Sequence, residues 1–269
     1  MAEPGRLAVY RRLYAAQIRG QSSYRTSFLL DLASNALIPL IDVLVILATF
    51  RVTRTIGGFT MVEVLVMYGL SVTSFALADL VVGNIERIRW YVRLGTLDAV
   101  LVRPLSALGQ LVAADFSIRR VARLVVALIV LTLAVRQAGV DWTPARIALL
   151  LTAPVVGAVF FGAMFVGTAT IAFWWIDSGE FANGFTYGGR DFTTYPVTVY
   201  SGVFRGLFGY AMGFGFVAYY PALALLGRSD PLGLPAWVAW CGPVVAVAAV
   251  GVAALMWRAG IRHYRSTGS

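Results

Sequence analysis

Few residues of this chain belong to the types that perform enzyme chemistry. Among 269 residues there is one histidine, His263, one cysteine, Cys241, and no lysine. One histidine and one cysteine cannot assemble a zinc site, and one cysteine cannot form an internal disulfide. Phosphate-binding loops of the GxxxxGK[ST] type and Schiff-base enzymes both require a lysine. We therefore expect a chain that is not an enzyme and that binds no metal, nucleotide or other cofactor itself.

The acidic residues supply one further candidate for chemistry. Asp42 lies well inside a long apolar run, next to Pro39. Ionisable side chains at that depth in a membrane helix are costly and are often functional. Asp42 could line a polar path or relay protons, or it could be a satisfied structural contact, and the sequence leaves both readings open. Asp79 lies near the end of the next apolar run, where Arg25 or Arg87 could pair with it.

Helices that cross a bilayer must position these side chains. The chain is 59% hydrophobic and only 13% charged, with a mean hydropathy of +0.78, which is not typical of a soluble domain. A hydrocarbon core of ~30 Å requires about 20 apolar helical residues. Six apolar blocks occur at 28–50, 61–82, 121–135, 147–176, 203–226 and 237–257. We predict an all-α membrane protein with six transmembrane helices, forming one domain over residues 1–269.

The arginines predict the orientation of these spans. With six spans, 17 of the 22 arginines fall on the side that both termini share. Short loops rich in arginine stay in the cytoplasm. We therefore expect both termini to be cytoplasmic, and this assignment places Arg190 and Arg205 on the cytoplasmic side.

The segment 1–27 precedes the first span and has an amphipathic pattern. Its apolar residues recur at helical spacing among arginines: Leu7, Tyr10, Tyr14 and Ile18. This pattern predicts a helix that lies in the cytoplasmic interface of the membrane. A generic basic segment beside the membrane is the alternative.

The segment 83–115 is the longest hydrophilic stretch and predicts two short helices. Gly95 separates them, Thr96 can cap the second helix, and Pro104 ends it. The second helix has an apolar stripe of Leu97, Val100 and Leu101. Such a pair of helices could dock into a groove on a partner or rest on lipid headgroups, and the sequence does not decide between these.

The fifth predicted span carries a stripe of glycines, Gly202, Gly206, Gly209 and Gly213, spaced four, three and four residues apart. Small residues at this spacing let two membrane helices approach closely. The stripe could pack against another span of the chain or against a second copy. Before it, 177–200 is expected to form a second cytoplasmic loop, whose acids lack the spacing of a metal site.

Four segments resemble one family of membrane proteins. The stretch 95–105, GTLDAVLVRPL, looks like the pattern that follows the second span of ABC-2-type export permeases. The stretches FWW at 173–175, YPVTVY at 195–200 and AYYPA at 218–222 are similar to a bacterial branch of that superfamily. The resemblance covers nearly the whole chain. It implies the ABC-2, type V exporter-like fold in a bacterial cytoplasmic membrane.

The resemblance also implies partners. Permeases of this kind pair with a second permease, identical or related, and recruit two separate ATPase subunits that bind ATP and Mg²⁺; membrane lipid is a further partner, and nucleic acid is not. The region 83–115 would be the part that couples to the ATPase. Its expected coupling residues are Arg87, Arg89, Trp90, Arg93, Leu97, Asp98, Leu101, Arg103 and Pro104.

The cargo is indicated only by the fourth predicted span. Residues 147–176 contain no charged side chain, which favours a hydrophobic or amphiphilic cargo such as a drug, a lipid or a glycolipid. A secondary transporter or channel without an ATPase partner is the main alternative. An intramembrane lipid-modifying enzyme is the other, but it would need paired acids with a metal, or a nucleophile beside a histidine.

Overall fold

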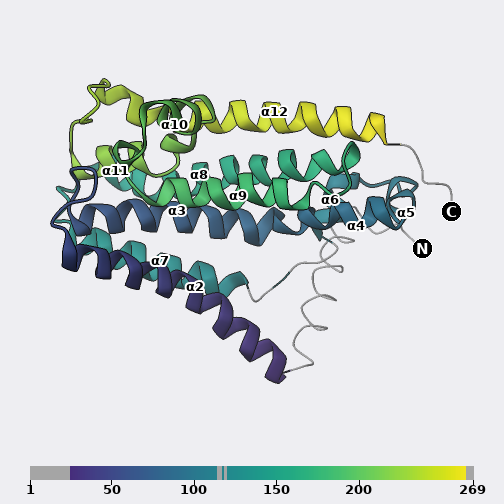
Figure 1. The fold of residues 1–269 in the computed structure, drawn as a ribbon, viewed down its shortest axis with the longest axis horizontal. Helices are drawn as coiled ribbons and strands as arrows, with labels where there is room; N and C mark the ends of the chain where they lie inside the picture. Colours follow the sequence, from purple (N-terminus) through teal and green to yellow (C-terminus); the bar gives the residue numbers. More distant parts are fainter. Residues whose placement is uncertain (1–24, 114–116, 118–119, 265–269) are drawn as a thin grey trace.

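The computed structural model describes residues 25–113, 117 and 120–264, and these are almost entirely helical. Long helices lie lengthwise beside one another: α2 (Arg25–Val52), α3 (Met61–Val82), α7 (Arg120–Gln137), α8 (Pro144–Thr170), α9 (Gly179–Thr194) and α12 (Gly242–His263) (Figure 1). The predicted interfacial helix at 1–27 lies almost wholly outside the described residues.

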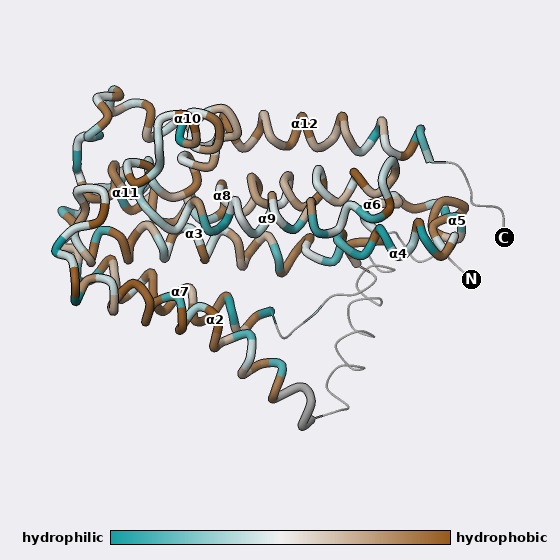
Figure 2. Tube along the Cα trace, in the orientation of Figure 1, coloured by the Kyte–Doolittle hydropathy of each residue, from teal (hydrophilic) through white to brown (hydrophobic). Residues whose placement is uncertain are grey.

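Short helices gather at the two ends of this bundle. At one end, near the last turns of α12, lie α4 (Ile88–Arg93), α5 (Leu97–Leu101) and α6 (Ala107–Ala113) (Figure 1). At the other end lie α10 (Gly202–Phe204) and α11 (Tyr219–Leu226). Figure 2 shows mostly hydrophobic residues along α12 and hydrophilic residues in its last turns and on α4. Hydrophilic residues are thus gathered at the α4 end of the bundle, and they also occur along α9.

Four helical stretches are long and apolar enough to cross a membrane. They are Leu30–Val52, Met61–Arg93, Pro144–Phe173 and Gly242–His263. A fifth is reached if the bent pair Gly202–Ala211 and Phe214–Leu226 is one span. These helices establish a multi-pass architecture, while the count of six spans stays a prediction.

α3 is the central helix of the bundle. It begins after Thr60, whose backbone N–H donates to the Glu63 carboxylate in a capping box, and Gly83 caps its end. Side chains on nearly all sides of α3 are buried, because α7, α8 and α9 surround it. A Cβ at Gly69 would come within 2.8 Å of the Leu131 Cα, so this glycine is what lets α7 approach α3 closely.

The segment 177–200, expected as a loop, instead contains α9. This helix runs lengthwise against α3 and α8 (Figure 1). Its composition is polar, but on the face that packs against the bundle the polar side chains find partners. The Thr186 hydroxyl, for example, lies 3.0 Å from that of Thr168 in α8. Polar residues that are satisfied within the bundle explain why composition alone indicated a loop.

The predicted fifth span is not one straight helix. After α10 the chain forms a π-helix, Arg205–Ala211, and then bends by 64° before the segment Phe214–Leu226. Gly213 lies at the bend with a φ of +87°, a conformation that favours glycine. Arg205 therefore lies near α10, at the end of the bundle away from α4, and not on the predicted side (Figure 1).

The bend also divides the predicted glycine stripe. Gly209 and Gly213 are buried against side chains of the same chain, including Val197 and Val245. A Cβ at Gly202 or at Gly206 would meet nothing within 4 Å. The four glycines thus do not form one continuous helical face, because that face requires regular α-helical geometry through residue 213.

Candidate functional site

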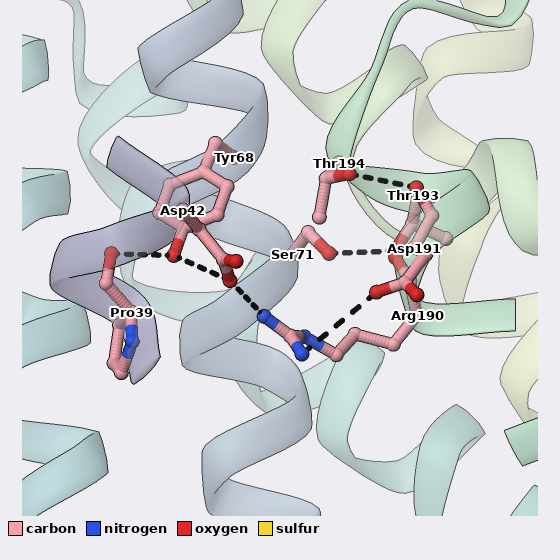
Figure 3. A network of polar contacts seen from close by, with 8 residues as sticks. All are labelled: Pro39, Asp42, Tyr68, Ser71, Arg190, Asp191, Thr193 and Thr194. Carbon is pink, nitrogen blue, oxygen red and sulfur yellow. Dashed lines mark hydrogen bonds and ion pairs between the residues drawn. The ribbon is translucent and has the colours of Figure 1, made fainter. Parts of the chain in front are cut away.

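A network of polar contacts joins α2, α3 and α9 (Figure 3). At its centre the Arg190 guanidinium of α9 pairs with the Asp42 carboxylate of α2. The Tyr68 hydroxyl of α3 lies 3.2 Å from Asp42 Oδ2 and 3.0 Å from the Pro39 carbonyl oxygen, and it donates toward both. Three helices that are far apart in sequence are thus linked through one ion pair.

The network lies near the middle of the bundle's length. The Ser71 and Thr193 hydroxyls are 2.5 Å apart, and Ser71 is the eleventh of the 22 residues of α3. The Phe75 ring, one turn further along, lies 5.9 Å from the Arg190 guanidinium carbon. In a membrane this level corresponds to the hydrocarbon core, where charged side chains need a partner.

The charges of the network do not cancel completely. Asp191 Oδ1 is 3.8 Å from Arg190 Nη1, so two carboxylates share one guanidinium. Arg190 is largely enclosed, with 17% of its side chain exposed, against 35% for Asp42 and 71% for Asp191. Asp42 is therefore a satisfied contact in this structure, and the residue that satisfies it is Arg190, which we had assigned to a cytoplasmic loop.

A second ionic cluster lies between this network and α4. Asp79 is 3% exposed and pairs with two arginines of α7, with distances of 3.3 Å to Arg120 Nε and 3.0 Å to Arg123 Nη1. Arg123 also donates to the Asn35 side-chain oxygen of α2 at 3.1 Å. The sequence identified Asp79 as a residue that needs a partner but did not assign these two.

The predicted pair of short helices is present as α4 and α5. Gly95 separates them with a φ of +68°, which favours glycine. One face of the pair is anchored in the bundle by the buried side chains of Ile88, Val92, Leu97 and Val100. The Gln110 amide of α6 holds the end of α5 by donating to the Val100 carbonyl at 2.9 Å.

The opposite face of α4 and α5 is open and mixes apolar and basic groups. Large apolar side chains exposed there are Trp90, Leu94, Leu101 and Val102. The guanidinium carbons of Arg89 and Arg93 lie 5.6 and 5.4 Å from the Trp90 ring. Trp90 and the two arginines line a 210 Å³ cavity together with Ile176, Asp177 and Glu180. Within this cavity Arg93 pairs with Asp177.

The coupling residues that the sequence suggested differ in exposure. Those exposed are Arg87, Trp90, Arg93, Leu101, Arg103 and Pro104. Leu97 is buried, whereas Arg89 and Asp98 are half-buried. The Tyr264 phenol, one residue beyond α12, lies near Asp98 of α5, so the end of α12 is beside α5. Burial, and to a lesser extent the Asp98 carboxylate, raises the pKa of this phenol. The exposed members can meet a partner, Leu97 anchors α5 in the bundle, and half-buried Arg89 lies against Gly179 of α9 while its guanidinium flanks the exposed Trp90.

The sequence of the chain matches one protein family along most of its length. A family model described as "ABC-2 family transporter protein" matches residues 36–268. The chain belongs to the ABC-2 transporter family. Comparisons with curated proteins and with solved structures found no significant match.

Membership in the ABC-2 family confirms the resemblance seen in the sequence. Together with its apolar helices, it identifies the chain as a multi-pass membrane protein with the role of a permease, the transport component; members of this family are generally not enzymes. Permeases of this family associate with ABC ATPases in general. The two sites described above, the polar network and the α4–α5 surface, are therefore sites of an ABC-2 permease.

Proposed function

We propose that this ABC-2 permease is the membrane subunit of an ATP-driven exporter in a bacterial cytoplasmic membrane. It would work as a pair of permeases, identical or related, with two separate ATPase subunits that bind ATP and Mg²⁺. The path of the chain in Figure 1 supports six crossings, by α2, α3, α7, α8, α9 and α12. The bent segment after α9 would then re-enter the membrane from the outer side.

The distribution of arginines supports placing the α4 end of the bundle in the cytoplasm. The bias persists after Arg190 and Arg205 are reassigned, since the chain before α2, the region between α3 and α7, and the end of α12 still hold most of the arginines. Such segments stay on the cytoplasmic side of a membrane. Both termini would accordingly be cytoplasmic.

The observation that carries the proposal is the construction of the α4–α5 surface. Its anchored face joins it firmly to the bundle, and α4 follows α3 directly after a five-residue 3₁₀-helix, Gly83–Arg87. Its open face exposes Trp90 and Val102, at 47% and 83%, among arginines. Aromatic and arginine side chains are enriched where proteins bind one another. Movement of an ATPase docked on this face would pass directly into α3.

The interior supports an apolar or amphiphilic cargo. A 470 Å³ cavity between α8, α9, the π-helix and α12 is lined mainly by aliphatic and aromatic side chains and by Met164, Met212 and Met256. Cavities of this size suit drug-sized molecules, and methionine adapts to varied apolar shapes. Asp42 and Arg190 do not line this cavity; they would hold α2 against α9, and their separation would accompany opening.

Charge reversal on the α4–α5 surface tests the coupling assignment. We expect Arg89→Glu combined with Arg93→Glu to reduce the amount of ATPase that copurifies with the tagged permease, because both arginines flank Trp90. The matched control is Arg51→Glu combined with Arg54→Glu, two exposed arginines at the opposite end. Equal ATPase recovery from both double variants, each correctly folded, would show that the ATPase docks elsewhere.

A transport assay separates the proposal from its alternative. In proteoliposomes we expect a fluorescent phospholipid or a lipophilic dye to move only when the copurifying ATPase and Mg-ATP are both present. Movement by the permease alone, driven by an ion gradient, would instead establish a secondary transporter.

A further inference from the structure

An apolar groove runs along the outside of the bundle between α3, α8 and α12. Its volume is 550 Å³, and its walls include Val81 of α3, Ala158 and Gly162 of α8, and Ala254 of α12. Apart from Trp257 and Arg258, α8 and α12 line the groove only with glycine, alanine and valine. At one end lie Trp257 and Arg258. The groove is thus apolar along its length and basic at one end.

The length of the groove corresponds to one leaflet of a bilayer. On α12 it extends from Val250 to Arg258, which at 1.5 Å per residue is about 12 Å. Half of a ~30 Å hydrocarbon core is about 15 Å. The Arg258 end lies toward the last turns of α12, on the same end of the bundle as α4 and α5 (Figure 1). The groove therefore occupies the leaflet next to the arginine-rich end.

The basic end of the groove is suited to an anion. Arg258 is exposed and makes no ion pair or hydrogen bond with the residues that the structure describes. Tryptophan, here Trp257, prefers the headgroup level of a membrane. Arginine binds phosphate through charge-assisted hydrogen bonds, and these are strong at the edge of a membrane, where water competes less.

We propose that this groove binds an anionic phospholipid, with an acyl chain along Ala158, Gly162 and Ala254 and the phosphate group at Arg258. The lipid belongs to the leaflet at the α4 end, which is the cytoplasmic leaflet in the orientation proposed above. This site adjoins the 470 Å³ cavity, since Ala163 and Ala253 line both, but the groove faces α3 whereas the cavity extends toward α9. The inference does not depend on an ATPase partner.

The positive charge at one end of the groove favours a lipid over a second copy of the chain as the occupant. A second copy of the chain would have to bring an acidic group to Arg258 and apolar side chains into the groove at once. An anionic lipid supplies both from one molecule and is present wherever the chain is inserted. Because α3 forms one wall and also leads into α4, a bound lipid would brace the helix that carries the coupling surface.

Native mass spectrometry of the full chain in mild detergent tests this site. Phosphatidylglycerol and phosphatidylcholine with identical acyl chains are added separately, and the affinity of the first bound lipid is measured. Both lipids carry a phosphate, but the choline ammonium offsets its charge in phosphatidylcholine, so we expect phosphatidylglycerol, a net anion, to bind about tenfold more tightly. Arg258→Gln should abolish this preference. Arg262→Gln, which removes the same charge one turn further along α12, should retain it.

A second pair of variants tests the groove itself. A Cβ at Gly162 would meet only Val82 Cγ2, at 3.5 Å, so Gly162→Leu can place its side chain in the groove. We expect it to weaken both lipids about tenfold. Gly251→Leu is the control, because Gly251 lies on α12 with nothing within 4 Å and does not line the groove.

Three results would overturn the proposal. The first is that Arg258→Gln and Arg262→Gln reduce the preference for phosphatidylglycerol over phosphatidylcholine equally, which would indicate a general charge effect. The second is unchanged lipid binding in folded Gly162→Leu. The third is a change in oligomeric mass in Gly162→Leu without a change in lipid binding, which would show that a second copy fills the groove. Should Gly162→Leu fail to fold, the two arginine variants decide the question.

Discussion

The ion pair between Asp42 and Arg190 makes the most specific prediction about this permease. In Asp42→Asn the Arg190 guanidinium keeps its place, 17% exposed at the middle of the bundle, but loses its closest carboxylate. Asp191 remains 3.8 Å away and compensates in part. The Tyr68 hydroxyl loses a charged acceptor but keeps the Pro39 carbonyl at 3.0 Å. The main loss of stability thus comes from leaving the enclosed Arg190 guanidinium without its closest carboxylate.

Two limits bracket the size of this cost. Breaking a fully buried ion pair costs roughly 3–5 kcal/mol, whereas removing a neutral hydrogen bond between membrane helices costs about 0.6 kcal/mol on average. Asp42 is one-third exposed and Asp191 stays nearby, so both solvent and a second carboxylate reduce the loss. We therefore expect Asp42→Asn to lower the free energy of unfolding by about 2 kcal/mol.

Equilibrium unfolding in mixed detergent and sodium dodecyl sulfate micelles measures this loss. Arg190→Gln should cost a similar amount, and the double variant should be more stable than the sum of the two losses predicts, with a coupling energy of about 1–2 kcal/mol. Ser34→Ala serves as a control, since Ser34 is an exposed residue of α2 that bonds only to the Leu30 carbonyl of its own helix. Strictly additive losses would refute the reasoning, because they would mean that the pair does not hold α2 to α9.

Two further predictions concern the stability of the bundle. Gly213→Ala should lower the free energy of unfolding by about 1–3 kcal/mol, measured in the same micelles, because the φ of Gly213 is +87° and the new Cβ would lie 2.5 Å from Val245. Gly188→Ala is the control and should change the free energy of unfolding little, because a Cβ has open space there. Similar losses in both variants would contradict this account of the bend. Asp79→Asn should lower the free energy of unfolding by about 3–5 kcal/mol, because it leaves two arginines of α7 beside a buried neutral group. A thermal unfolding midpoint equal to that of the unmodified chain would show that those arginines find other partners.

Helices with simple composition could be predicted well from the sequence. The block predicted at 61–82 is α3, Met61–Val82, because an unbroken apolar run lies between the capping residue Thr60 and Gly83. The two short helices around Gly95 were also predicted, since a glycine between two amphipathic stretches favours a break. In both places local chemistry and the final packing agree.

α9 could not be predicted in the same way. Hydropathy measures each segment against lipid, but one face of α9 packs against α3 and α8, and polar groups on that face bond within the bundle. One signal was available: Thr186, Arg190 and Thr194 recur every four residues, which is helical spacing for a polar face. That α2 supplies the carboxylate for this face follows only from the three-dimensional arrangement.

The bend after α9 shows a second limit of pattern analysis. Glycines spaced four, three and four residues apart are equally compatible with a straight helix and with a helix that breaks at the last of them. The left-handed conformation of Gly213 decides for a break, and packing against α12 through Val245 stabilises it. The sequence contains the residue that permits the bend but not the contacts that require it.

The most direct test of the central claim is purification of the tagged chain from its native membrane. The account predicts that an ATPase subunit is recovered in equal amount and that the complex hydrolyses Mg-ATP, with recovery falling in the Arg89→Glu, Arg93→Glu double variant. Recovery of the permease alone, in a form that still moves its cargo across a membrane when no ATPase is added, would contradict it.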